Sequence, residues 1–257
     1  MRRTLRLVAL TWWLHVKMLN RSAFDTLLTI VWPLFFATIA LLLYRMEGDA
    51  DALTYAAFGA GVMTIWTAIS STASAILLRE RGSGTLELLV AAPVPFSVSI
   101  VSMVLAVSTI GGYGMAATLV WSAVVFGVDI AIAQPLLFAV AVVVTLVSFA
   151  VIGFILSVTV VRYRAAWALG AAFEYPVWLV CGFLVPVALL PDWLRPVSWL
   201  LPPSWGMAAV RAAVAGQVPG KELLACAVLV VVYAAAGVWL AGTFLHSARR
   251  HATLSLR

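Results

Sequence analysis

Long apolar stretches separated by short polar connections dominate this chain. They lie near residues 26–44, 57–78, 99–126, 136–160, 165–190 and 222–245. Each is close to or longer than the roughly 20 residues that a helix needs to cross a bilayer. None shows the alternation of polar and apolar positions that is typical of barrel strands. Because a helix satisfies its own backbone hydrogen bonds in lipid, the pattern predicts an all-α integral membrane protein with six transmembrane helices.

The first 22 residues carry a different pattern. Apolar residues fall on one stripe at helical spacing: Leu5, Val8, Trp12, Val16 and Leu19. Basic residues lie largely off this stripe: Arg2, Arg6, Lys17 and Arg21. The pattern is typical of an amphipathic helix in the membrane–water interface. The alternative is a basic tail that only fixes the orientation of the chain, and the apolar stripe favours the helix.

A segment rich in proline and tryptophan precedes the last apolar run. Prolines at positions 191, 196, 202 and 203 exclude one continuous helix. Trp193, Trp199 and Trp205 suit the membrane–water boundary, where an apolar ring with a polar N–H is favoured. We therefore expect short external helices, re-entrant in character, that dip partly into the outer leaflet.

Composition narrows the possible functions. The chain is 64% hydrophobic and 10% charged, with a mean hydropathy of +1.09, which leaves no room for a sizeable soluble catalytic domain. We expect a single transmembrane domain over residues 1–257. The basic residues are scattered, which does not favour nucleic-acid binding. Cys181 and Cys226 lie in apolar runs, so the sequence predicts packing cysteines and no metal site or cofactor in this chain.

Basic residues are distributed unequally between the two sides of the predicted spans. One side carries twelve of them: Arg2, Arg3, Arg6, Lys17, Arg21, Arg79, Arg81, Arg162, Arg164, Arg249, Arg250 and Arg257. The other side carries four: Arg45, Arg195, Arg211 and Lys221. Since basic residues accumulate on the cytoplasmic side of membrane proteins, both termini are predicted to be cytoplasmic. The acidic residues Glu47, Asp49, Asp51 and Asp129 then face outward.

The predicted cytoplasmic connection at 78–95 has glycine, threonine and proline in an order that predicts a turn followed by a short helix. Gly82 and Gly84 can stop the preceding helix, and Thr85 can cap a new short helix through Glu87. Prolines at 93 and 95 end that helix before the third span. A short helix tied to two spans in this way can pass a displacement into the membrane when a partner binds it.

These residues also carry a family resemblance. Arg79-Glu80-Arg81-Gly82, then Gly84-Thr85-Leu86-Glu87-Leu88-Leu89 and Ala92-Pro93-Val94, resembles the E-R-x-x-G-T-L-E-x-L-x-x-[AT]-P-[VI] signature of the ABC-2 export permeases. Here Gly82-Ser83-Gly84 adds one residue to the commonest spacing. The segment 190–206 is similar to the family's L-P-x-W-L-x-x-[IVL] hallmark, with Pro202-Pro203 in place of Asn-Pro. The similarity covers essentially the whole chain.

The resemblance implies a membrane subunit that depends on partner chains. The family's architecture is a pair of permeases, identical or sibling, seated on two separately encoded ABC ATPase subunits in a bacterial inner membrane. The coupling residues implied are Arg79, Glu80, Arg81, Gly82, Gly84, Thr85, Leu86 and Glu87. ATP and Mg²⁺ would be bound by the partner ATPase, because this chain has no G-x-x-x-x-G-K-[ST] loop and is not itself an enzyme. The competing interpretation of Arg79, Glu80 and Arg81 is a set of solvated orientation anchors.

Glu174 is the one carboxylate near the middle of an apolar run. Placing a charge there costs roughly 2.5–3.5 kcal/mol on insertion scales, so such a residue usually faces a bundle interior or a wet cavity. One hypothesis is that Glu174, with Tyr175 and Trp178, lines a path for substrate. The other is a protonated carboxyl group that hydrogen-bonds another helix. The alternative function is a self-contained secondary transporter or channel that uses Glu174, although no internal repeat supports it.

The resemblance leaves the substrate open. Export of a hydrophobic or amphipathic molecule, such as a drug, an antibiotic, a lipid or a lipid-linked glycan, is the expectation that follows from it. An aromatic-rich path would suit such a molecule.

Overall fold

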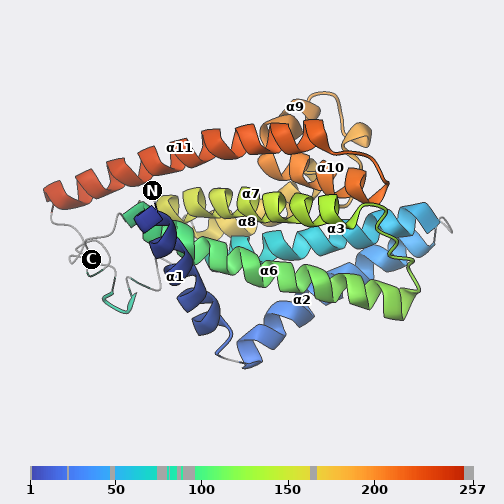
Figure 1. Ribbon diagram of the computed structural model, residues 1–257, viewed down its shortest axis with the longest axis horizontal. Coiled ribbons are helices and arrows are strands. Elements are labelled where there is room, and N and C mark those ends of the chain that lie inside the picture. Colours follow the sequence, from blue (N-terminus) through green and yellow to red (C-terminus); the bar gives the residue numbers. More distant parts are fainter. Residues whose placement is uncertain are drawn as a thin grey trace.

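The chain forms a bundle of helices that run largely along one long axis (Figure 1). The computed structural model describes residues 2–21, 23–46, 50–73, 80, 82–85, 88, 96–162 and 167–251. Within those ranges the regular structure is helical and contains no strand. The predicted all-α class is therefore confirmed.

The helices follow the apolar runs of the sequence closely. Their bounds are α1 Arg2–Leu19, α2 Ala23–Arg45, α3 Ala50–Ala68, the π-helical turn η1 Ile69–Ala73, α6 Phe96–Phe126, α7 Pro135–Arg162, α8 Trp167–Val180, the 3₁₀ turn η3 Val187–Leu189, α9 Arg195–Leu200, α10 Pro202–Val214 and α11 Gly220–His251.

Within the described ranges, four helical stretches are long and apolar enough to cross a membrane: Asp51–Thr72, Phe96–Phe126, Pro135–Thr159 and Gly220–Thr243. These correspond to the second, third, fourth and sixth predicted runs. Helix α2 contributes a shorter apolar stretch, Pro33–Arg45. The protein is thus a multi-pass membrane protein.

The sequence predicted one helix over the fifth apolar run, 165–190, and this prediction is wrong at its C-terminal end. Helix α8 ends at Val180, and Gly182 follows with a left-handed φ of 75°. The Phe183 N–H bonds the Trp178 carbonyl oxygen at 3.0 Å, and the Gly182 N–H bonds the Leu179 carbonyl oxygen at 3.1 Å. This is the Schellman arrangement that closes many helices. The 14 residues of α8 span about 21 Å at 1.5 Å per residue.

Helix α3 is the most deeply embedded of the long helices and packs along α6. Small residues allow a close approach between the two helices. A side chain at Gly59 would bring its Cβ within 1.9 Å of the Phe183 carbonyl oxygen. One at Gly111 of α6 would meet the Ile65 Cα at 2.7 Å. The backbone of α3 is therefore in close contact with the backbone of its neighbours at these glycines.

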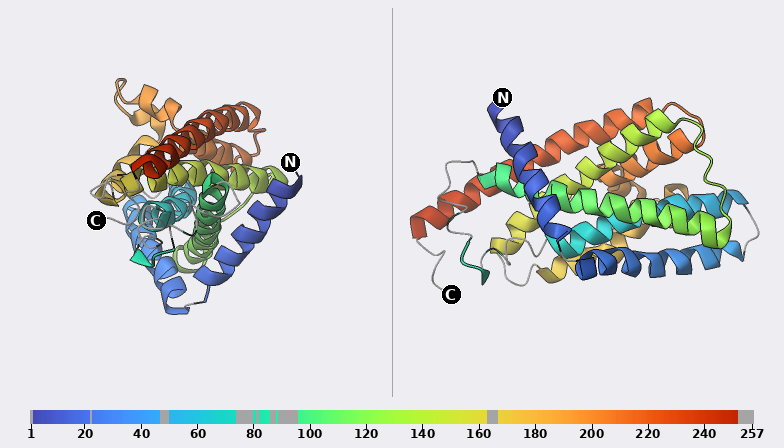
Figure 2. Two further views of the ribbon diagram at one scale, coloured as in Figure 1. Left: turned by 90° about the vertical axis from the view of Figure 1, so that its left-hand side faces the viewer. Right: turned by 60° about the horizontal axis from the view of Figure 1, so that its bottom comes forward.

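Helix α1 crosses the long helices at a steep angle near one end of the bundle (Figure 2). It packs on α6, where Trp12 Nε1 donates to Thr109 Oγ1 at 3.0 Å. Val16 is buried against Ala106 and Ile110. Leu5 belongs to the same predicted stripe, yet it is 63% exposed. The N-terminal segment thus forms a helix whose apolar stripe packs on α6 through the C-terminal half, and its position in the membrane interface stays a prediction.

The proline-rich segment forms the predicted short helices. Leu201 separates α9 from α10, and Pro202 and Pro203 occupy the first turn of α10, where the missing N–H costs nothing. Helix α10 packs between α7 and α11. Figure 1 places α9 and α10 at the end of the bundle opposite the end of α11 and the start of α1.

Candidate functional site

The turn that carries the signature is described for Glu80 and for residues 82–85. Gly84 has a left-handed φ of 69°, and the Thr85 N–H bonds the Glu80 carbonyl oxygen at 3.0 Å. The spacing again matches a Schellman closure, with Gly84 as the left-handed residue. Gly84 therefore ends the preceding helical turn, as the sequence predicted.

The Thr85 side chain turns back toward Glu80. Its hydroxyl lies 3.1 Å from the Glu80 carbonyl oxygen and also donates to the Glu80 carboxylate. The predicted forward cap involves Glu87, which lies outside the described residues together with Arg79, Arg81 and Leu86. Gly82 and Gly84 are exposed, and Leu88 is 69% exposed. The turn thus offers both polar and apolar surface to a partner.

Helix α3 continues into a widened turn, η1, whose last residue lies seven positions before Glu80. Residues Ile69–Ala73 form the π-helix η1, a rare form that occurs mostly as single turns inside α-helices and is frequent at functional sites. The Ser71 hydroxyl donates to the Thr67 carbonyl oxygen at 2.7 Å, and Ser70 Oγ lies 3.2 Å from the same oxygen. These side chains satisfy backbone acceptors where the helical ladder changes register.

Glu174 lies beside this widened turn. Side-chain hydrogen bonds join its carboxyl group to Thr67 and Ser70 of α3, and the residue is half-buried. Hydroxyl donors supply the partners that a carboxyl group needs at low dielectric. Glu174 thereby connects α8 to the end of α3 that leads toward the signature turn.

The two aromatic residues predicted beside Glu174 lie in different environments. Tyr175 is 56% exposed on the surface of α8, whereas Trp178 is 5% exposed. The Trp178 ring packs edge-on against Phe36 of α2, with 5.5 Å between ring centroids, and against Tyr175 at 5.0 Å. In the single chain, Tyr175 is the one of this pair that is open to an incoming molecule.

A second polar centre lies at the opposite end of the bundle. Arg211 of α10 donates from Nη1 to the Gly182 carbonyl oxygen at 2.6 Å and to the Tyr55 hydroxyl at 2.5 Å, and from Nη2 to the Phe183 carbonyl oxygen at 3.0 Å. Its guanidinium carbon lies 3.3 Å from the centre of the Tyr55 ring. Burial lowers the pKa of Arg211 to about 10, against the opposing effect of Tyr55, so the side chain is a cation at neutral pH.

This cation closes the unwound end of α8. The Tyr55 hydroxyl also donates to the Gly182 carbonyl oxygen at 3.1 Å, and Tyr44 of α2 donates to the Leu184 carbonyl oxygen. Side chains from α2, α3 and α10 therefore satisfy the carbonyl groups after the helix end. We call Arg211, Tyr55 and Tyr44, with the carbonyl groups of residues 182–184, the outer clasp. The distribution of basic residues predicts that this end of the bundle, the outer end, faces outward and that the end with the signature turn, the inner end, faces the cytoplasm.

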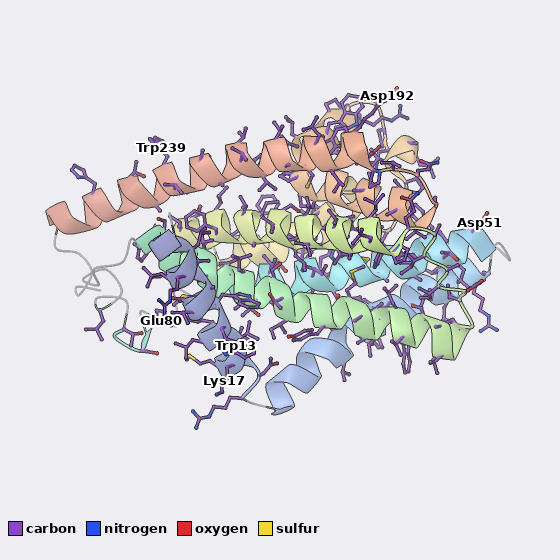
Figure 3. The ribbon with its side chains drawn as sticks, in the orientation of Figure 1. Trp13, Lys17, Asp51, Glu80, Asp192 and Trp239 are labelled. Carbon is purple, nitrogen blue, oxygen red and sulfur yellow. The ribbon has the colours of Figure 1, made fainter. Side chains whose placement is uncertain are left out.

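A cavity of about 510 Å³ opens next to the outer clasp. Its lining includes Asp51, Tyr55, Phe58, Asp129 and Arg211. The carboxylates of Asp51 and Asp129 belong to exposed residues. Figure 3 shows Asp51 and Asp192 at this end, and Lys17 and Glu80 at the other. Asp51 and Asp129, which were predicted to face outward, thus lie at the end opposite the signature turn. Glu47 and Asp49, which share that prediction, lie outside the described residues.

In the sequence, Arg211 was predicted only to be one of four external basic residues. The signal that marks it is its position inside α10, among mostly apolar residues, where a cation needs buried acceptors. The η1 turn left no recognisable signal, because its Ser and Thr residues also suit ordinary helix packing.

Comparison with known proteins agrees with the architecture. The family model described as ABC-2 type transporter matches residues 6–215, which include both polar centres. A search of curated proteins found no match. Because the match spans most of the chain, this protein is a membrane-embedded transport subunit and belongs to the ABC-2 type transporter family, whose members in general associate with an ABC ATPase.

Proposed function

We propose that the chain is the permease subunit of a bacterial ABC exporter. It would move a hydrophobic or amphipathic substrate, such as a drug, an antibiotic, a lipid or a lipid-linked glycan, out of the cell. Two copies, or this chain and a sibling, form the path in the inner membrane. A separately encoded ATPase binds ATP and Mg²⁺ and supplies the energy.

The observation that carries the proposal is the exposed signature turn and its position. Glu80 and Thr85 hold the turn in a defined shape through their hydrogen bonds, while the exposed Leu88 offers an apolar contact. A rigid, exposed turn is a suitable handle for a partner, because a force applied to it is not lost in local flexing. Arg79, Arg81, Leu86 and Glu87 complete the proposed handle.

Force on this handle has a short route into the membrane. The turn follows α3, whose last residues form η1, and Glu174 joins η1 to α8. A π-turn carries one residue more than the helix needs, so it can shorten or rotate without breaking the helix. ATP-driven movement of the handle would therefore reach α3 and α8 together.

The proposed topology has six spans with both termini in the cytoplasm. Helix α2, with 23 residues, and helix α8, with 14, supply the other two spans. The excess of basic residues on the side of the handle supports the orientation. The substrate path would run along α8, where Tyr175 is exposed and Glu174 selects cationic or hydroxyl-bearing groups.

The test is co-purification of the full chain with the ABC ATPase encoded beside it, followed by measurement of ATP hydrolysis in lipid. Glu80→Ala with Glu87→Ala should weaken assembly or uncouple ATP turnover. The matched control is Asp129→Ala with Glu222→Ala, which removes the same charge far from the handle and should leave both intact. Failure of a folded chain to bind any ATPase would favour the secondary transporter that uses Glu174.

A further inference from the structure

Helix α1 covers α6 only partly, and a groove remains between the two helices. It measures about 740 Å³, and its lining includes Trp13, Leu14, Lys17, Met18, Arg21 and Tyr113. Neither the proposed handle nor the proposed path uses any of these residues. Figure 3 shows Trp13 and Lys17 close together near the junction of α1 and α2.

The groove combines apolar surface with positive charge. Trp13, Leu14 and Met18 are 61%, 55% and 60% exposed and form an apolar surface of the kind that contacts lipid acyl chains. Lys17 and Arg21 are exposed beside them. Trp13 and Lys17 are four residues apart on one side of α1, and Arg21 follows in the turn after Leu19 and lines the same groove. A small hydrophilic anion would satisfy the charges and leave the apolar wall uncovered. An amphiphile with an anionic headgroup satisfies both.

The N-terminal segment has no acidic residue of its own to neutralise this charge. Residues 1–24 contain five basic residues and no aspartate or glutamate. Basic residues next to a membrane attract anionic lipid with a free energy of about 1 kcal/mol each. The charge of the groove is therefore complementary to the headgroup of an anionic phospholipid.

We propose that the groove between α1 and α6 binds one phospholipid with an anionic headgroup. Lys17 and Arg21 hold the phosphate, and an acyl chain lies along Leu14 and Met18. Trp13 and Tyr113 flank the headgroup, as aromatic residues do at a membrane interface. The lipid belongs to the cytoplasmic leaflet, an assignment that rests on the proposed orientation, whereas the binding itself does not.

A lipid in this position would fix α1 against α6. The two helices are already joined by the Trp12–Thr109 hydrogen bond and by the buried apolar cluster of Val16, Ala106 and Ile110, with Trp12 and Leu19 at its edges. The lipid adds further contacts at the corner where α1 passes into α2.

Native mass spectrometry of the purified full chain tests the proposal, with phosphatidylglycerol and phosphatidylcholine as the probes. Lys17→Gln with Arg21→Gln should weaken binding of phosphatidylglycerol roughly thirtyfold, because each basic residue near an anionic surface contributes about fivefold in affinity. Arg6→Gln with Arg45→Gln removes the same charge from exposed positions outside the groove and should leave binding within about twofold of wild type. The measurement needs neither ATPase nor transport, so its outcome is independent of the proposed function.

A second measurement locates the lipid. Phosphatidylglycerol with brominated acyl chains should quench the fluorescence of Trp13, which is read as the difference between the wild type and Trp13→Phe. Equal losses in both double variants would indicate general attraction and would overturn the site. Equal binding of the two lipids would overturn the role of charge, and absence of lipid would assign the groove to a protein partner.

Discussion

The two ends of the bundle use different chemistry to hydrogen-bond the polar groups that lie inside it. At the outer end, the cation of Arg211 and two tyrosine hydroxyls hold backbone carbonyl groups that α8 leaves behind. At the inner end, neutral hydroxyl groups of Thr67 and Ser70 hold the half-buried Glu174 beside a π-turn. A largely buried cation cannot leave its acceptors without a large penalty, whereas hydroxyl partners exchange cheaply. We therefore expect the outer end to stay closed and the inner end to rearrange.

Replacement of Arg211, the cation of the outer clasp, is expected to have the largest effect on stability. Arg211→Met leaves the Phe183 carbonyl group and the Tyr55 hydroxyl without their buried donor, which should lower the free energy of unfolding by about 3 kcal/mol. The measurement is unfolding in mixed micelles. Arg195→Met is the matched control, because Arg195 also donates to backbone carbonyl groups but is 39% exposed. Its loss should stay below about 1 kcal/mol, since water replaces the bonds. Equal losses would contradict a special role for the outer clasp.

A glycine at each end gives the next comparison. At the outer end, Gly59→Ala would place a Cβ 1.9 Å from the Phe183 carbonyl oxygen, so the backbone must shift at a cost of about 2 kcal/mol. At the inner end, a Cβ at Gly82 meets nothing within 4 Å. Gly82→Ala should therefore leave the free energy of unfolding unchanged in the same micelle assay. A destabilising Gly82→Ala would mean that the inner end is packed as tightly as the outer one.

The smallest effect on stability is expected at the hydroxyl partner of Glu174. Thr67→Val keeps the shape of the side chain and removes the donor, so the free energy of unfolding should fall by only about 0.6 kcal/mol, the average for such bonds in a membrane. ATP turnover coupled to this chain should nevertheless change, because α8 would no longer follow η1. A loss of stability close to that of Arg211→Met, with coupling unchanged, would reverse the roles of the two ends.

Much of the fold follows from the sequence because lipid restricts the chain to helices. The runs at 99–126, 136–160 and 222–245 lie within helices α6, α7 and α11, since hydropathy reports directly on length and apolar character. The glycine that ends the signature turn was also predictable, because a left-handed residue favours glycine. The early end of α8 was not, since residues 181–190 remain apolar and their carbonyl partners come from distant helices.

The candidate site likewise contains residues that stand out in the sequence and others that only the structure identifies. The signature residues and Glu174 stand out in the sequence, the first through their order and the second as a carboxylate in an apolar run. Their partners do not stand out, because Thr67, Ser70 and Tyr55 become special only through what they contact. Trp178 was expected beside Glu174 on an open path, and its burial against Phe36 depends on the packing of α2 against α8.

The most direct test measures movement at both ends in the complex with the ATPase. Spin labels at Ser71→Cys and Ala172→Cys report on the inner end, and labels at Asp51→Cys and Ala215→Cys report on the outer end. All four positions are exposed, and all but Ala215 lie in helices. Cys181 and Cys226, which are buried, are replaced by alanine. Our account predicts that trapping with ATP changes the inner distance and leaves the outer distance unchanged. An unchanged inner distance, or an equal change at both ends, would contradict it.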